Sequence, residues 1–101
     1  MEFYTISENE LQKYLGRKDV LLIDLRKTAD YMSGHLPGAV NIPFDRFDKH
    51  TGLLEDGSFK IVIFYCERGN LSLRMARDFA KRGFHAMSLA GGMASYYGKL
   101  V

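Results

Sequence analysis

The sequence predicts an α/β fold in which a mostly parallel sheet carries helices on both faces. Short apolar runs alternate along the chain with stretches of helical periodicity, as residues 60–65 and 72–82 illustrate. This alternation is typical of βαβ units, whose strands run parallel. The apolar runs are also continuous rather than interrupted by polar residues, which indicates strands that are buried on both faces.

Four segments have the composition of strands. Residues 60–65 form the strongest of them, because they are rich in β-branched and aromatic side chains. Residues 20–23 form an apolar run that is too short for a buried helix. Residues 39–42 are expected to form a short strand that ends at Pro43, and residues 84–89 form the last of the four.

Two short helices are predicted in the first third of the chain. Ser7 and Glu10 have the spacing of a capping box, and Gly16 stands where a helix-terminating glycine is expected. Residues 28–33 are expected to form a second helix with Thr28 as its N-cap. Phe44 and Phe47 suggest one further helical turn, and residues 93–97 a final one.

The longest helix is predicted to begin at Ser72, a favourable N-cap residue, and to end before Gly83. Its apolar side chains fall on one face, as in an amphipathic helix. The opposite face is basic, and we expect it to be solvated, with docking of an acidic protein as the alternative. The basic residues are Arg74, Arg77, Lys81 and Arg82.

Length and charge limit the classes of function. The 101 residues predict a single domain over 1–101, expected to be a monomer. A net charge of +2, from 14 basic and 12 acidic residues, does not favour a nucleic-acid or membrane partner. No run approaches the roughly 18 apolar residues of a membrane-spanning helix. Residues 1–5 do not resemble a secretory leader, so we expect a cytoplasmic location.

Cys66 is the only cysteine, which excludes an intramolecular disulfide and a cysteine-rich zinc site. His50 and His85 are isolated in the sequence, so we expect neither a metal nor a cofactor. Cys66 directly follows the strand at 60–65, and ligands of open α/β sheets bind at the carboxyl ends of strands. Two more polar clusters, at 24–26 and 91–92, are predicted at the same edge.

The segment after Cys66 is a short loop that leads into the long helix. Successive backbone N–H groups in such a loop can converge on one point, and the helix N-terminus adds a partial positive charge. This predicts a nucleophilic thiolate beside an anion-binding site. The alternative is an inert buried thiol, although a strand-to-loop junction is an unusual place for one. The candidate substrate-binding residues are Glu67, Arg68, Gly69, Asn70, Leu71 and Ser72.

Four segments together resemble the successive motifs of the rhodanese family. They are residues 22–26, 34–39, 61–72 and 91–93, and their order and spacing match the family. The resemblance implies a five-stranded parallel sheet. It also implies that Cys66 takes sulfane sulfur from thiosulfate or another donor, forms a persulfide, and passes the sulfur to a thiol or to cyanide. A sulfur-relay protein is a further partner that the resemblance suggests.

The chain departs from the family pattern at three positions. Glu67 stands where the family often has a basic residue, Leu71 where a basic or small residue is frequent, and Tyr96 where Trp is common. The first two changes reduce positive charge or add bulk near the anion site. They weaken the case for thiosulfate as the donor more than the case for persulfide chemistry.

Two alternative functions compete with sulfur transfer. A cysteine-dependent phosphatase or arsenate reductase needs a Cys-x5-Arg loop, in which the arginine holds the oxyanion. Ser72 occupies the arginine position in this chain, and the nearest later arginine is Arg74. A non-catalytic binding module of the same fold is the other alternative. The intact Cys66 argues against it, whereas Glu67 and Leu71 leave it open.

The remaining candidates have structural explanations that we prefer. Asp24 and Arg26 are expected to pair with each other's neighbours and to fix the loop after their strand, rather than to touch substrate. His35 lies in a glycine- and proline-containing turn, where a hydrogen bond to the backbone is expected rather than a catalytic role. Four methionines are expected to fill gaps in the core: Met32, Met75, Met87 and Met93.

Overall fold

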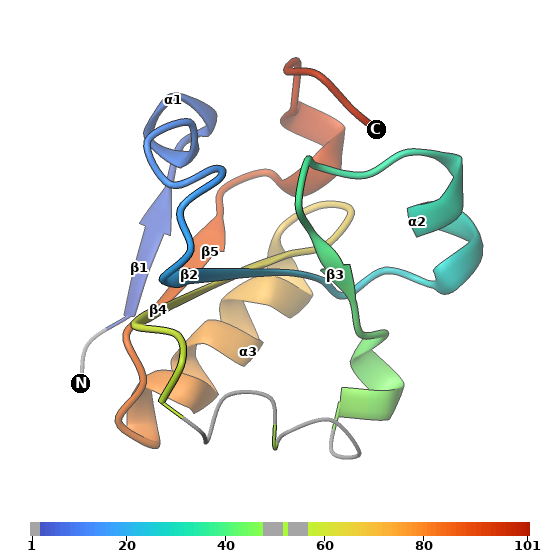
Figure 1. The fold of residues 1–101 in the computed structure, drawn as a ribbon. Helices are drawn as coiled ribbons and strands as arrows, with labels where there is room; N and C mark the ends of the chain where they lie inside the picture. Colours follow the sequence, from blue (N-terminus) through green and yellow to red (C-terminus); the bar gives the residue numbers. More distant parts are fainter. Residues whose placement is uncertain (1–2, 48–51, 53–56) are drawn as a thin grey trace.

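The structure, a computed structural model, describes residues 3–47, 52 and 57–101. Within these residues, five strands form one parallel sheet in the order β1-β5-β4-β2-β3 (Figure 1). The strands are β1 (Phe3–Ile6), β2 (Val20–Asp24), β3 (Val40–Asn41), β4 (Ile61–Tyr65) and β5 (Ala86–Leu89). The predicted fold class is therefore confirmed.

The central strand β4 is buried along its whole length. Successive side chains of a strand point to opposite faces of the sheet. Val62 and Phe64 accordingly join one core cluster, while Ile61, Ile63 and Tyr65 join the other. Because both faces of β4 are covered, every position along it is apolar or aromatic, which explains the continuous run in the sequence.

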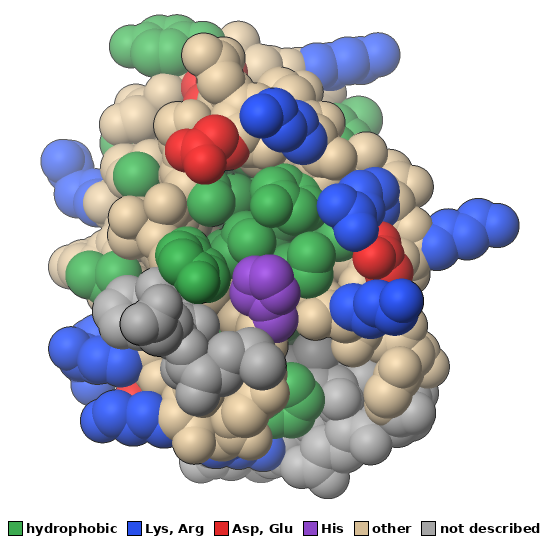
Figure 2. All heavy atoms as spheres, turned by 90° about the vertical axis from the view of Figure 1, so that its left-hand side faces the viewer, with side chains coloured by type: hydrophobic (Ala, Val, Ile, Leu, Met, Phe, Trp, Pro, Cys, Tyr) green, Lys and Arg blue, Asp and Glu red, His purple; other side chains and the backbone are tan. Residues whose placement is uncertain are grey.

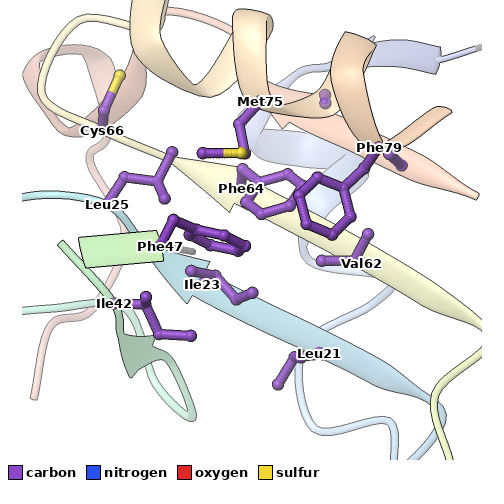
Figure 3. Close-up of a cluster of buried hydrophobic side chains, with 12 residues drawn as sticks. Leu21, Ile23, Leu25, Ile42, Phe47, Val62, Phe64, Cys66, Met75 and Phe79 are labelled. Atoms are coloured by element: carbon purple, nitrogen blue, oxygen red, sulfur yellow. The ribbon is translucent and has the colours of Figure 1, made fainter. Parts of the chain in front are cut away.

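Helix α3 (Asn70–Lys81) covers one face of the sheet together with a 3₁₀ turn at 44–47. The aromatic side chains of the cluster beneath it come from α3, this turn and β4 (Figure 3). The ring centroid of Phe79 lies 5.2 Å from that of Phe47 and 5.2 Å from that of Phe64. These contacts hold α3 against the carboxyl half of β4, where Cys66 follows.

The opposite face is covered by α1 (Glu8–Leu11), by the turn that precedes β3 and by the C-terminal segment (Figure 1). The predicted capping box of α1 is present, with the Ser7 side chain accepting from the Glu10 N–H and the Glu10 carboxylate from the Ser7 N–H. Helix α1 is short, and a hollow of about 330 Å³ remains beside it. Figure 2 shows this side of the molecule, where a group of apolar side chains lies next to a histidine. The His85 and Tyr4 rings meet edge to face in the lining of the hollow.

Several predicted boundaries differ from the structure. Strand β1 was not predicted, since four residues at a sheet edge carry too little periodicity to indicate a strand. The first helix ends at Leu11, and turns rather than helix lead to Gly16. The last helical turn is the 3₁₀ helix η2 (Gly92–Ser95). His50 lies outside the described residues.

Helix α2 (Thr28–Ser33) differs from expectation in its cap and in its packing. Its N-cap is Lys27 rather than Thr28, and it has no side-chain cap. None of its residues is buried, and Met32 is 77% exposed, so the prediction of Met32 as a core residue is wrong. Met75 and Met87 are buried as predicted, and Met93 packs partly buried against the second cluster.

The start of α3 also corrects the sequence prediction. The N-cap is Gly69, with φ +99°, and the helix begins at Asn70, two residues before Ser72. Ser72 is a poor candidate for the cap because its hydroxyl lies inside the protein, where it is engaged in other hydrogen bonds. The basic face of α3 is exposed, as predicted. Among the described residues, no helix is long and apolar enough to cross a bilayer.

Candidate active site

Cys66 lies at the carboxyl end of β4, where it lines a cavity of about 460 Å³. Its side chain lies at the end of the buried cluster beyond Leu25, next to the first turn of α3 (Figure 3). The residue is only 3% exposed, so access to the sulfur is through the cavity. The segment after β2 and the segment after β3 form the other walls. The lining residues are Leu25, Arg26, Lys27, Asp30, Pro43, Phe44, Asp45, Cys66, Glu67 and Leu71.

Two backbone N–H groups point at the sulfur. The Gly69 N–H donates to Cys66 Sγ with an N···S distance of 3.1 Å, and the Ser72 N–H donates at 3.4 Å. Both belong to the N-terminal end of α3, whose unpaired N–H groups carry partial positive charge. This arrangement stabilises negative charge on the sulfur without a histidine or lysine partner.

The Ser72 side chain links the sulfur to the interior. Its hydroxyl lies 3.6 Å from Cys66 Sγ, donates to the Gly69 carbonyl at 3.1 Å, and lies 2.8 Å from Ser88 Oγ. Both serines are buried. Since a hydroxyl has one proton and two acceptor lone pairs, these hydrogen bonds give both buried serine side chains a partner. They also hold the loop beside the sulfur.

The glycine pair at 91–92 fixes the other side of the loop. The Met93 N–H donates to the Cys66 carbonyl at 2.9 Å, and the Ala94 N–H donates to the Glu67 carbonyl at 2.8 Å. Gly92 has φ +60°, and a Cβ on it would lie 2.7 Å from the Glu67 carbonyl oxygen and closer still to that of Cys66. The third polar cluster predicted at this edge therefore supports the backbone of the loop.

Gly92→Ala should disrupt this support. We expect the left-handed backbone conformation to cost about 1–3 kcal/mol of stability. The collision with two carbonyls should also displace the loop and lower the rate of any reaction at Cys66 by at least about tenfold, a shift of about 1.4 kcal/mol. Thermal unfolding and the alkylation rate of Cys66 measure the two effects.

Gly83→Ala is the matched control for that variant. Gly83 has φ +94°, but a Cβ there would meet nothing within 4 Å. It should therefore lose stability without changing the reactivity of Cys66. Equal alkylation rates in the two variants would contradict the assigned role of Gly92.

Asp24 and Arg26 have the predicted structural role, but they form a buried ion pair with each other rather than with neighbouring residues. Asp24 is fully buried, and the Arg26 side chain is 8% exposed. Arg26 Nη2 donates to Asp24 Oδ2 at 2.8 Å and to the Gly34 carbonyl at 2.7 Å, and the Arg26 backbone N–H donates to Asp24 Oδ1 at 2.8 Å. The pair thus joins the end of β2 to the turn that begins at Gly34, while Arg26 also lines the cavity.

That turn is held by its own contacts. His35 Nδ1 lies 2.9 Å from the Tyr31 carbonyl and its ring stacks on that of Tyr31, so the predicted backbone hydrogen bond is confirmed. The Leu36 N–H donates to Tyr65 Oη at 3.2 Å. Burial raises the pKa of Tyr65 above its ordinary value, so its hydroxyl stays protonated. The motif at 34–38 therefore adds none of its residues to the cavity lining, and it reaches the site through the Gly34 carbonyl, which holds Arg26.

The predicted site residues fall into three groups. Gly69 and Ser72 contact the sulfur through their N–H groups. Among the described residues, the cavity lining includes Glu67 and Leu71 but neither Arg68 nor Asn70. Asn70 instead accepts the Leu71 N–H through its side chain, and Arg68 is exposed.

Several lining residues escaped the sequence prediction. They are Lys27 and Asp30, which follow β2, and the segment 43–45, which follows β3. The rule that ligands bind beyond the carboxyl ends of parallel strands could have indicated 43–45, since Pro43 closely follows the predicted strand at 39–42. No pattern in the neighbouring sequence indicates that Asp30 lines the cavity, because its position there depends on how α2 packs in the folded protein.

Comparison with known proteins agrees with this geometry. Residues 7–99 match the Rhodanese-like domain family. The chain belongs to this family. A tRNA sulfurtransferase of Desulfurococcus amylolyticus is 38% identical over 78 residues, which cover 77% of this chain and 15% of that protein. A thiosulfate:glutathione sulfurtransferase of Saccharomyces cerevisiae is 26% identical over 99 residues, covering 85% of this chain and 71% of the yeast protein.

The fold of this rhodanese-like chain matches solved structures over nearly its whole length. The crystal structure of a rhodanese-like domain protein from Staphylococcus aureus has a TM-score of 0.82 and 25% sequence identity. The match covers 97% of this chain and 96% of the staphylococcal one. The chain therefore corresponds to a small part of the archaeal tRNA sulfurtransferase but to nearly all of this staphylococcal structure.

The rhodanese-like loop does not have the form that a phosphatase or arsenate reductase needs. Ser72 stands at the position of the oxyanion-binding arginine, and its hydroxyl is turned to Gly69 and Ser88. Arg74, the next arginine, lies with its guanidinium 5.6 Å from the ring centroid of Phe44. Neither residue supplies the bidentate cation at the base of the loop that this chemistry requires.

Proposed function

We propose that this rhodanese-like chain is a sulfurtransferase that carries sulfane sulfur on Cys66. The observation that supports the proposal best is the position of Cys66 Sγ, which lines the cavity and accepts two N–H groups from the start of α3. A sulfur in that position is accessible to a substrate and stabilised as an anion. Relatives named as sulfurtransferases agree with this chemistry.

The first half-reaction loads the cysteine. The Cys66 thiolate attacks the outer sulfur of a donor, either thiosulfate or an organic persulfide. A bond forms between Sγ and that sulfur, while the bond between the two donor sulfurs breaks. The leaving group takes the electron pair as sulfite or as a thiolate. Charge and atoms balance without an oxidant or a metal.

The second half-reaction discharges the persulfide. An acceptor, either a thiol or cyanide, attacks the outer sulfur and leaves the Cys66 thiolate behind. The N–H groups of Gly69 and Ser72 stabilise that thiolate as a leaving group. Since Cys66 is the only cysteine in the 101 residues, no second thiol of this chain can accept the sulfur. The acceptor therefore lies outside these 101 residues, for example a small thiol or a sulfur-relay protein.

Steady-state transfer tests the proposal. Thiosulfate or glutathione persulfide serves as donor, cyanide as acceptor, and thiocyanate is the measured product. We expect turnover with at least one donor, and complete inhibition after alkylation with iodoacetamide, which can modify only one cysteine. A folded protein that forms no thiocyanate with either donor would overturn the proposal in favour of a non-catalytic binding module.

A further inference from the structure

We infer that the natural donor and acceptor carry a neutral or positively charged organic group beside the reacting sulfur, so that thiosulfate, a dianion, is a poor substrate. This inference rests on the proposed function, because it assigns the substrate class of the same site. It follows from the charges and the size of the cavity that Cys66 lines.

The most buried cation among the described residues of the lining is already paired with a carboxylate. Arg26 is the most buried charged residue of the lining, but its guanidinium donates three hydrogen bonds to the Asp24 carboxylate, at 2.8–3.1 Å. A further donation goes to the Gly34 carbonyl. Its remaining terminal nitrogen, Nη1, lies 4.0 Å from Glu67 Oε1. The charge and most of the donors of Arg26 are thus matched by protein groups before any substrate arrives.

The rest of the lining is acidic. Among the described residues of the lining, Asp30, Asp45 and Glu67 carry carboxylates, and Lys27 is the cation besides Arg26. Asp24, behind Arg26, adds one more negative charge. Two arginines near the start of α3 lie outside this lining. Arg68 is exposed, and the Arg74 guanidinium lies over the Phe44 ring. Away from the two N–H groups that face the sulfur, the side-chain charges of the lining should therefore repel an anion and attract a cation.

The cavity also has room and apolar surface that a small dianion does not use. Its volume is about 460 Å³, and four of its lining residues are apolar. These residues are Leu25, Pro43, Phe44 and Leu71. Apolar walls with a few placed charges are typical of sites for organic ligands. In a substrate with a carbon chain and an ammonium group near its sulfur, the carbon chain would pack on the apolar residues and the ammonium group would pair with the carboxylates.

The chemistry with such substrates balances as before. The Cys66 thiolate and a persulfide R–S–SH give the Cys66 persulfide and the thiolate R–S⁻, with one S–S bond formed and one broken. The reverse reaction, with a different thiolate, discharges the protein. A positive charge on R lowers the free energy of both encounters in an acidic cavity.

Discharge of loaded protein by three small thiols tests the inference. The full chain is first loaded with concentrated thiosulfate or with sodium disulfide, and loading is verified by intact mass. It is then mixed at low salt with cysteamine, 2-mercaptoethanol or 3-mercaptopropionate, which are cationic, neutral and anionic. Loss of the sulfur atom is followed by mass. The measured quantity is the rate with cysteamine divided by the rate with 3-mercaptopropionate.

The rate ratio is measured for the wild type and for Glu67→Gln. Because the same two thiols are used with both proteins, their intrinsic reactivities cancel when the two ratios are compared. We expect Glu67→Gln to lower the rate ratio by about three- to tenfold, because the Glu67 carboxylate attracts cationic cysteamine and repels anionic 3-mercaptopropionate. The effect should shrink at high salt. Glu67→Arg should lower the ratio further and raise kcat/KM for thiosulfate. Asp78→Asn, which removes an exposed carboxylate of α3 outside this lining, is the control and should leave the ratio unchanged.

The outcomes separate the two proposals. An unchanged ratio in Glu67→Gln, or an equal change in Asp78→Asn, overturns the substrate class while the loading and discharge themselves still support sulfur transfer. A wild-type protein that cannot be loaded by either donor overturns the proposed function, and the substrate class with it.

Discussion

Replacing Cys66 by serine should reduce sulfur transfer to the uncatalysed background, a loss of at least about a thousandfold or 4 kcal/mol in activation free energy. Serine cannot form a persulfide, and its hydroxyl is not appreciably ionised at neutral pH. The fold should persist, because the smaller hydroxyl can still accept from the Gly69 and Ser72 N–H groups that now point at the sulfur. Thiocyanate formation and thermal unfolding measure the two properties.

The stability of the Cys66→Ser variant is the control for its activity. We expect its free energy of unfolding to lie within about 1.5 kcal/mol of the wild type, the size of one buried hydrogen bond. Wild-type turnover in a folded Cys66→Ser protein would show that the sulfur of Cys66 is not the carrier.

Arg26→Leu should destabilise the protein strongly, because it leaves the fully buried Asp24 carboxylate without its cation. Removing one partner of a buried ion pair costs about 3–5 kcal/mol, since the remaining charge is neither solvated nor paired. The loss also frees the Gly34 carbonyl that Arg26 Nη2 now binds. Urea unfolding followed by circular dichroism measures the change in the free energy of unfolding.

The chain offers a matched control for this prediction. Arg17 pairs with Asp19 through two hydrogen bonds of 3.0 and 2.7 Å, but their side chains are 45% and 32% exposed. Arg17→Leu should therefore cost less than about 1 kcal/mol. Adding Asp24→Asn to Arg26→Leu should recover part of the lost stability, because the uncompensated charge is removed. Equal losses from Arg17→Leu and Arg26→Leu would contradict the structural role assigned to the Asp24–Arg26 pair.

The elements that were predicted well from the sequence are those whose environment leaves a local pattern. Strand β4 is buried on both faces, so its apolar residues form a continuous run. Helix α3 has one buried face, so its apolar residues recur with the period of an amphipathic helix. The position of Cys66 at the junction of these two elements was therefore predicted with them.

Features that depend on tertiary contacts were not predicted. Strand β1 is a strand of four residues at the edge of the described sheet, where it pairs with β5, and Tyr4 within it is 48% exposed. Serine is a residue type favoured at N-caps, but Ser72 lies within the first turn of α3, where its hydroxyl contacts Gly69 and Ser88. Asp30 and Asp45 join the cavity lining from two separate segments, and no local pattern brings them together.

Sulfur transfer through Cys66 is tested most directly by the intact mass of the wild-type protein after incubation with a sulfur donor, followed by peptide mapping. We predict a gain of one sulfur atom, located on the peptide that contains Cys66, removed by added thiol and absent from Cys66→Ser. A wild-type protein that stays unmodified with thiosulfate, sodium disulfide and glutathione persulfide, or a sulfur atom that is still gained by Cys66→Ser, would contradict this role of Cys66.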